Sequence, residues 1–160
     1  MADTPEFLSE RLIVDGEKSI DFFNQLPQEE WQKTIYTDGS VWTLHEVLAH
    51  FVTAELSLCK LVVNIASGGT GSPEDFDINL YNNRKVSGLK DAAVPDLLAE
   101  FRKNRQQTAE VVHSLAIQDL ERTGRHPYLG IAPLTEIIKI IYRHNQIHIR
   151  EIRKALSKAE

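Results

Sequence analysis

The chain has 160 residues, of which 42% are hydrophobic, so it is long enough to bury one sizeable core, and we expect a single domain over residues 1–160. With 23 acidic and 18 basic side chains it carries a formal net charge of −5, without the basic footprint of a nucleic-acid-binding protein. The single cysteine, Cys59, excludes an intrachain disulfide and a multi-cysteine zinc site, as is usual in a reducing compartment.

The N-terminal segment predicts a helix rather than a targeting signal. The sequence MADTPEFLSERLIVDGE is acidic and lacks the basic start and apolar middle of an export signal. Leucine and phenylalanine recur at near-helical spacing from about Thr4 to Leu26, and Pro27 then ends the helix. Because the longest apolar stretches of the chain are short and interrupted, we expect a cytoplasmic protein without a membrane-spanning segment.

A turn and a second helix are predicted next. The sequence PQEEWQKTIY favours a short helical turn, and the following Asp38-Gly39 is typical of a turn. The sequence TLHE is a capping box, in which Thr43 accepts a hydrogen bond from a backbone amide and Glu46 reaches back. Apolar residues then recur at helical spacing, so the second helix is expected to run to about Ala66.

A long connection, SGGTGSPEDFDINLYNNRKVSGLKD, separates the second helix from the third, with one short helical piece expected near Phe76–Arg84. The third helix is predicted over Val94–Ile117 and the fourth over Ile131–Ser157, while no strand pattern of period two persists anywhere. Four amphipathic helices with a long crossover between the second and third predict an all-α four-helix bundle. The intervening RTGRHPYLG is interpreted as a loop, in which His126-Pro127 either shapes a bundle mouth or is ordinary loop structure.

Three local motifs fail at named positions. In HNQIH, Asn145 stands where the metalloprotease motif needs a glutamate as general base. The stretch SGGTGSPED lacks the Lys-Ser/Thr pair of a phosphate-binding loop and follows a helix. In DFDINLYNNRKV, Leu80 and Val86 replace the glycine and glutamate of a calcium-binding loop. These mismatches argue against zinc peptidase, nucleotide-binding and calcium-binding functions.

Two histidines lie on the inward stripe of the fourth predicted helix. His144 and His148 continue an apolar series with steps of three or four, which comprises Leu134, Ile137, Ile141, Ile152 and Leu156. Four residues correspond to 400° of helix, so the two rings lie one turn apart on one side and can share a single ion. For an isolated pair, buried imidazoles satisfied by hydrogen bonds are the simpler interpretation.

A third histidine changes this balance. His50 flanks the apolar stripe of the second helix, roughly 10 Å from its start, and His148 lies roughly 14 Å from the end of the fourth helix at ~1.5 Å per residue. The two levels match if these helices run antiparallel. Neither His45, about 140° round the helix from His50, nor Cys59, about 180° round, should join the same site, and His113 is given no role.

Three neutral imidazoles make a nitrogen-rich site for Zn²⁺, Ni²⁺, Fe²⁺ or Mn²⁺ with positions left for water or substrate. Glu46 and Glu151 lie close to His50 and His148 in sequence, so they are candidates to orient the rings or to move a proton. The alternatives are that Glu46 serves only the capping box and that Glu151 is a solvated charge.

With WTLHEVLAHFVTAE in the second helix and YRHNQIHIREIRKAL near the C-terminus, the chain resembles the DinB/YfiT-like superfamily of metal-dependent proteins over nearly its whole length. The resemblance implies an up-down-down-up four-helix bundle, a metal triad at His50, His144 and His148, zinc or nickel as the metal, and a homodimer. Relatives include thiol-dependent S-transferases and mycothiol-dependent maleylpyruvate isomerase. The isomerase has an additional C-terminal domain that 160 residues do not accommodate.

Two functions follow as hypotheses. The first is a metalloenzyme that acts on a small-molecule substrate, as a hydrolase or as a transferase using a low-molecular-weight thiol, in detoxification or stress response. The choice of a thiol rests on family analogy alone. The second is a non-catalytic dimer that binds a metal or another ligand, in which the histidines are structural or hold a stabilising ion.

Overall fold

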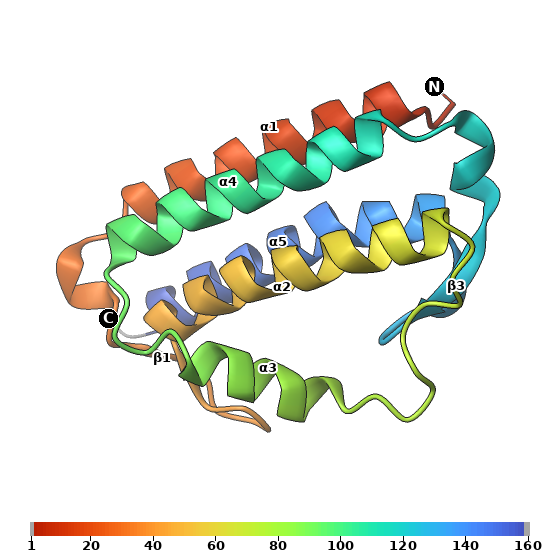
Figure 1. The fold of residues 1–160 in the computed structure, drawn as a ribbon. Helices are drawn as coiled ribbons and strands as arrows, with labels where there is room; N and C mark the ends of the chain where they lie inside the picture. Colours follow the sequence, from red (N-terminus) through yellow and green to blue (C-terminus); the bar gives the residue numbers. More distant parts are fainter. Residues whose placement is uncertain (1, 159–160) are drawn as a thin grey trace.

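The computed structural model describes residues 2–158, and this part of the chain is mostly helical, as predicted. In Figure 1 the four long helices lie alongside one another, and the short helix in the long connection lies along α2 on the side away from α4. The five helices are α1 (Pro5–Asn24), α2 (Leu44–Ala66), α3 (Ile78–Ser87), α4 (Val94–His113) and α5 (Leu134–Ser157).

The helix ends follow from local capping chemistry. The Thr4 hydroxyl accepts a hydrogen bond from the amide of Phe7, and the capping box predicted before α2 is present, with the Thr43 amide donating to Glu46 Oε1. The predicted third helix is too long, since α4 ends at His113. There the Ser114 hydroxyl donates to a carbonyl of the last turn, which offers the backbone an alternative to further helix.

The expectation of no strands is wrong in two places. An antiparallel hairpin of β1 (Thr34–Tyr36) and β2 (Trp42–Thr43) precedes α2, and a second hairpin of β3 (Thr123–His126) and β4 (Gly130–Pro133) precedes α5. The first hairpin follows a single 3₁₀ turn, which is all that forms of the predicted helical turn. Because residues 131–133 pair within the second hairpin, α5 begins at Leu134 rather than at the predicted Ile131.

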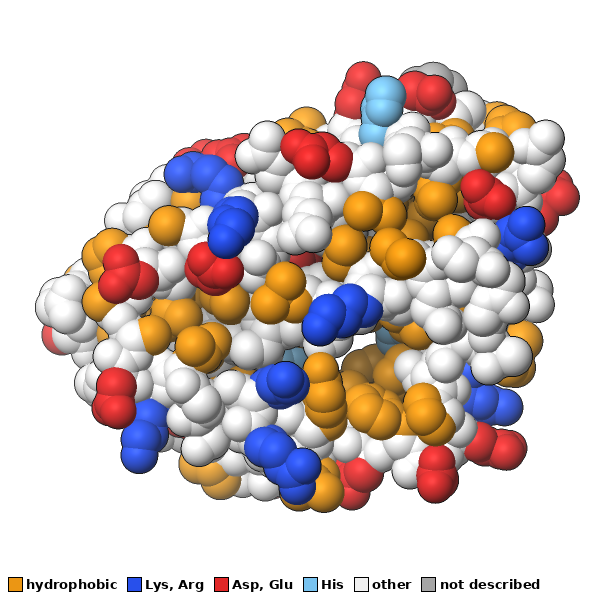
Figure 2. Space-filling model, in the orientation of Figure 1, with side chains coloured by type: hydrophobic (Ala, Val, Ile, Leu, Met, Phe, Trp, Pro, Cys, Tyr) orange, Lys and Arg blue, Asp and Glu red, His pale blue; other side chains and the backbone are white. Residues whose placement is uncertain are grey.

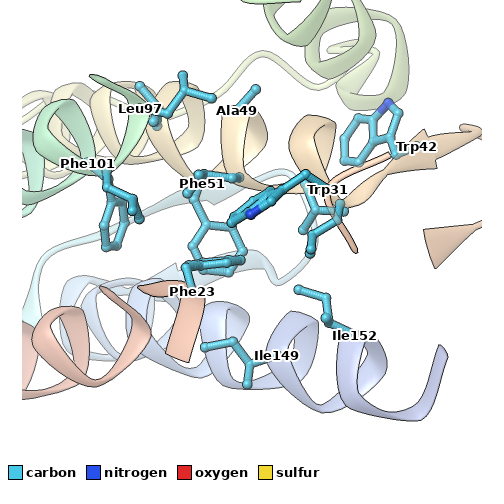
Figure 3. Packing of buried hydrophobic residues seen from close by; sticks show 14 of the residues in the cluster. Phe23, Trp31, Trp42, Ala49, Phe51, Leu97, Phe101, Ile149 and Ile152 are labelled. Atoms are coloured by element: carbon cyan, nitrogen blue, oxygen red, sulfur yellow. The ribbon is translucent and has the colours of Figure 1, made fainter. Parts of the chain in front are cut away.

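Two buried apolar clusters hold the helices together. One is rich in aromatic rings, and Figure 3 shows Phe23, Trp31 and Phe51 packed close to one another. The other is mostly aliphatic and joins α1, α2, α4 and α5 around residues such as Leu12 and Ile137. Since full burial of one such side chain stabilises a fold by about 1.5–3 kcal/mol, these clusters are the main source of stability.

A buried ionic cluster crosses the same helices. The guanidinium of Arg105, only 2% exposed, donates two hydrogen bonds of 2.9 Å to the carboxylate of Glu55 and a third to the carbonyl of Leu12. Asp15 lies 3.8 Å from the same guanidinium, and burial raises the pKa of its carboxyl. The cluster therefore connects α1, α2 and α4 through one cation.

By length and composition, α2 is apolar enough to cross a membrane, and it is the one helix of residues 2–158 that passes this test. Core helices of soluble proteins pass it as well, so the finding is weak evidence for a span. Eleven residues of α2 are buried inside the protein, which is how a central helix of a bundle packs.

Candidate metal centre

The structure brings the three predicted histidines together. In Figure 1, α2 and α5 lie side by side and run in opposite directions, which places His50 level with His144 and His148. The Nε2 atoms of His50 and His144 lie 3.4 Å apart, and those of His144 and His148 lie 2.8 Å apart. One ring nitrogen from each residue falls within 4.8 Å of the others. The predicted geometry of a common point between the second and fourth long helices is thus present.

The β1–β2 hairpin packs against these rings from outside the α2–α5 pair. It lays the Tyr36 ring beside His148 and the Trp42 ring beside His50, with ring centroids 5.6 Å and 4.9 Å apart. The Trp42 indole N–H donates to Asn83 in α3, so the tryptophan is held from the opposite side. The hairpin therefore restricts the orientation of two of the three imidazoles.

Burial keeps all three rings neutral. Desolvation lowers the pKa of His50, His144 and His148 to about 3, and each ring is disfavoured further by charge on a neighbouring imidazole. At neutral pH the rings therefore offer lone pairs rather than positive charge. Neutral imidazole is the form that binds a metal ion.

The donor set fits a divalent transition metal. Zinc–nitrogen bonds of roughly 2.0–2.1 Å in a tetrahedral site put two nitrogen ligands about 3.4 Å apart, which is the separation of His50 Nε2 and His144 Nε2. The Nε2 atoms of His144 and His148 are closer, at 2.8 Å, and would have to move apart by about 0.6 Å to reach that separation. Two Nε2 atoms at 2.8 Å also repel unless one carries a proton or a cation lies between them.

The outer edge of His148 is held by a tyrosine. The Tyr36 hydroxyl lies 2.5 Å from Nδ1 of His148, and the pKa of Tyr36 is raised by burial and then by hydrogen bonding and charge from Glu151. A hydroxyl that donates to the Glu151 carboxylate accepts from His148 Nδ1–H, which leaves the lone pair on Nε2 facing the other imidazoles. The Nδ1 of His50, in contrast, is buried without a hydrogen-bond partner among the described residues.

The remaining candidates lie outside the cluster. Nε2 of His45 contacts the carbonyl of Ala92 at 2.7 Å, Cys59 is buried with its pKa raised by desolvation, and His113 is exposed at the end of α4. Glu46 is engaged in the capping box, which agrees with the simpler of its two interpretations. Of the two carboxylates named from sequence, Glu151 is the one that acts on Tyr36, the residue in contact with His148.

A mostly apolar cavity of about 300 Å³ opens beside the histidines. His50 and His144 line its inner end, and its walls come from α2, α3, α5 and the β3–β4 hairpin, with Leu61, Phe76 and Tyr128 among the lining residues. Figure 2 shows a hollow on this face with hydrophobic side chains around it and histidine atoms inside. The arrangement is a mostly apolar cavity, of a volume within the range of small-molecule sites, that ends at a cluster of potential metal ligands.

The chain matches the DinB superfamily over residues 14–152, which is most of its length. The chain belongs to the DinB superfamily. The resemblance predicted from the two histidine-containing segments is thereby confirmed.

Relatives of this DinB-superfamily chain bear names that refer to metals. A Bacillus cereus protein named "Putative metal-dependent hydrolase" is 26% identical over 122 residues, which cover 72% of this chain and 67% of the relative. YfiT from Bacillus subtilis, described as a probable metal-dependent hydrolase with an unusual four-helix bundle topology, superposes with a TM-score of 0.76 at 17% identity, covering 97% of this chain and 87% of YfiT. The fold similarity therefore extends over almost the entire chain.

A variant of mycothiol-dependent maleylpyruvate isomerase also superposes on this DinB-superfamily chain, with a TM-score of 0.70 at 12% identity. The match covers 92% of this chain and 59% of the isomerase. At this identity the likeness concerns the fold alone. The exact up-down-down-up order of the helices stays a prediction from the resemblance.

Sequence reasoning missed the contribution of Tyr36 and Trp42. Both stand in TIYTDGSVWT, where β-forming residues flank Asp38-Gly39, and this is the strongest short-range signal for a hairpin. Because the start of this segment was interpreted as a helical turn, the packing of Tyr36 and Trp42 against the histidines was not predicted.

Proposed function

We propose that His50, His144 and His148 bind one divalent metal ion and that the protein is a metal-dependent hydrolase of a small molecule held in the adjacent cavity. The observation that carries this proposal is the convergence of three neutral imidazole nitrogens at the inner end of that cavity. Zinc or nickel is the expected metal, and iron and manganese suit the same ligands.

When bound, such an ion supplies Lewis-acid chemistry: it polarises a carbonyl group and lowers the pKa of water. The protein residues provide the surroundings. Tyr36 orients His148 through its Nδ1, the Trp42 ring restricts His50, and the apolar cavity walls exclude water from a bound substrate.

Transfer to a low-molecular-weight thiol is a finer version of the same proposal. It is supported by the sequence resemblance and by the fold shared with a mycothiol-dependent isomerase. The expectations of a cytoplasmic homodimer with the up-down-down-up helix order, a role in detoxification or stress response, and no nucleic-acid or membrane partner belong to this proposal too.

The decisive experiment is metal analysis of protein purified without an affinity tag. We expect about one divalent metal ion per chain, which is lost on His50→Ala and retained on His113→Ala, the matched control for an exposed histidine. Metal content that is absent from the unmodified protein, or that survives His50→Ala, contradicts the proposal.

Chelation separates the enzyme from a non-catalytic metal- or ligand-binding bundle. The non-catalytic alternative is supported by the position of the three histidines, because an ion held by them would also connect α2 to α5. If the ion is catalytic, a chelator abolishes turnover of ester or thioester substrates with a modest loss of stability. If the ion is structural, the chelator lowers the melting temperature and there is no turnover to lose.

A further inference from the structure

A fourth buried imidazole lies in the wall of the cavity. His126, at the end of β3, is 3% exposed, and it lines the cavity together with His50 and His144 but lies outside the cluster of ligand nitrogens. The metal-site proposal does not use this residue. Its chemistry is therefore open to a separate role in the same cavity.

The β3–β4 hairpin holds the His126 ring in one orientation. Nδ1 of His126 accepts hydrogen bonds from the backbone amides of Tyr128 at 3.0 Å and Leu129 at 3.3 Å. A nitrogen that accepts two N–H groups carries no proton, so the neutral ring bears its hydrogen on Nε2. Within residues 2–158 no protein group bonds this Nε2, which leaves its N–H available on the cavity side of the ring.

The hairpin is itself fixed to the α2–α3 connection. The amide of Arg125 donates to the carbonyl of Thr70, and the carbonyl of Arg125 accepts from the amide of Ser72, both at 2.8 Å. Between these two bonds, Gly71 packs directly against the Arg125 backbone. The hairpin also packs on α2: Gly124 lies so close to Ile65 that a Cβ at position 124 would be 2.5 Å from the Ile65 side chain. His126 is consequently positioned by backbone contacts rather than by a flexible loop.

The rest of the cavity wall favours an uncharged ligand. Several of the other polar groups there are already bonded: Ser57 and Tyr81 share a 2.7 Å hydrogen bond, and Asn64 Oδ1 accepts from the Gly71 amide. The one Lys or Arg among the lining residues, Lys60, is exposed to solvent. A buried ionic group would lose its hydration without a buried counter-charge, whereas a carbonyl oxygen needs only one donor.

We infer that the cavity takes a small, mostly apolar molecule with a carbonyl group, whose oxygen accepts a hydrogen bond from Nε2–H of His126. This inference rests on the proposed function and names the class of substrate on which the histidine centre would act. Such a donor would also stabilise the negative charge that develops on a carbonyl oxygen during acyl transfer, which is the usual role of a preorganised neutral donor.

Two matched probes test the inference on metal-free protein. Acetophenone has an apolar body with a carbonyl oxygen, and α-methylstyrene has the same shape with a methylene group in place of the oxygen. The ratio of their dissociation constants is measured by NMR titration for the unmodified protein, for His126→Phe and for the control His113→Phe. We expect the preference for acetophenone to fall roughly 2- to 10-fold in His126→Phe and to stay unchanged in the control.

An equal ratio in the unmodified protein and His126→Phe overturns the inference, as does failure of the unmodified protein to bind either probe. Nitrogen-15 NMR of the unmodified protein gives a measurement that does not depend on folding of a variant: the proton of His126 must lie on Nε2, and a proton on Nδ1 overturns the inference. Because no metal is present, these results do not depend on whether the three other histidines bind one.

Discussion

The Tyr36 hydroxyl lies 2.5 Å from Nδ1 of His148, although the two residues are 112 positions apart in sequence. The contact joins a two-stranded hairpin to the last helix, and it fixes which nitrogen of His148 faces the other imidazoles. Hydrogen-bond partners of this kind commonly orient metal-binding histidines.

Tyr36→Phe is therefore expected to weaken metal binding by roughly 10- to 100-fold, the range found when such partners are removed. Competition with a chromophoric zinc chelator measures the affinity. Tyr81→Phe is the matched control, because its hydroxyl bonds Ser57 rather than a histidine. Equal affinities of the two variants would show that Tyr36 does not orient His148.

The metal-free protein should lose stability as pH falls through the range of ordinary histidine titration. Burial lowers the pKa of His50, His144 and His148 to about 3 and that of His126 to about 4, while the unfolded rings titrate near 6.5. Below that value the unfolded state binds more protons, so stability is complete above about pH 6.5 and falls towards pH 3.

Each neutral buried ring contributes a slope of up to about 1.4 kcal/mol per pH unit to the free energy of unfolding between pH 6 and 5. Urea unfolding at several pH values measures the slope. His126→Phe removes one such ring and should reduce the slope by about that amount. A free energy of unfolding that does not change with pH in this window contradicts the burial argument.

Breaking the buried ionic cluster should destabilise the bundle strongly. Glu55→Gln removes the negative charge that lies closest to the buried Arg105 guanidinium. Removing one partner of a buried ion pair typically costs about 3–5 kcal/mol of stability. Replacing both residues with apolar ones, as in Arg105→Met with Glu55→Leu, should recover much of that loss. Urea unfolding measures the free energy of unfolding of these variants. The control is Glu17→Gln, which disrupts the exposed ion pair with Arg102 and for which we expect a loss of less than about 1 kcal/mol.

Gly71→Ala should disturb the hairpin that carries His126. Gly71 has a φ of +88°, and a Cβ there would lie 2.4 Å from the Arg125 carbonyl oxygen. Gly39→Ala is the matched control, since its φ is +71° with no atom within 4 Å, so it incurs only the backbone strain of about 1–2 kcal/mol. We expect a larger loss of thermal stability and weaker acetophenone binding for Gly71→Ala, and similar behaviour of both variants would show that the Arg125 contact is unimportant.

The sequence by itself determined the helical class of the protein and the three histidines of its candidate site. Periodicity identified the long helices because their apolar stripes repeat every three or four residues, and the same spacing placed His144 and His148 on one face. The capping box at Thr43 even set the start of α2. These features are local, so a single chain read in order contains them.

Only the tertiary structure decided what surrounds those rings. The short hairpins bury few residues of their own, and their partners are distant: Tyr36 meets His148, and Gly71 meets Arg125. Periodicity gives no information about such contacts, because strands of two to four residues are too short to show a repeat and their stability comes from packing on the bundle. The role of His126 depends on a ring orientation that two backbone amides impose, and only the folded chain brings those amides to its Nδ1.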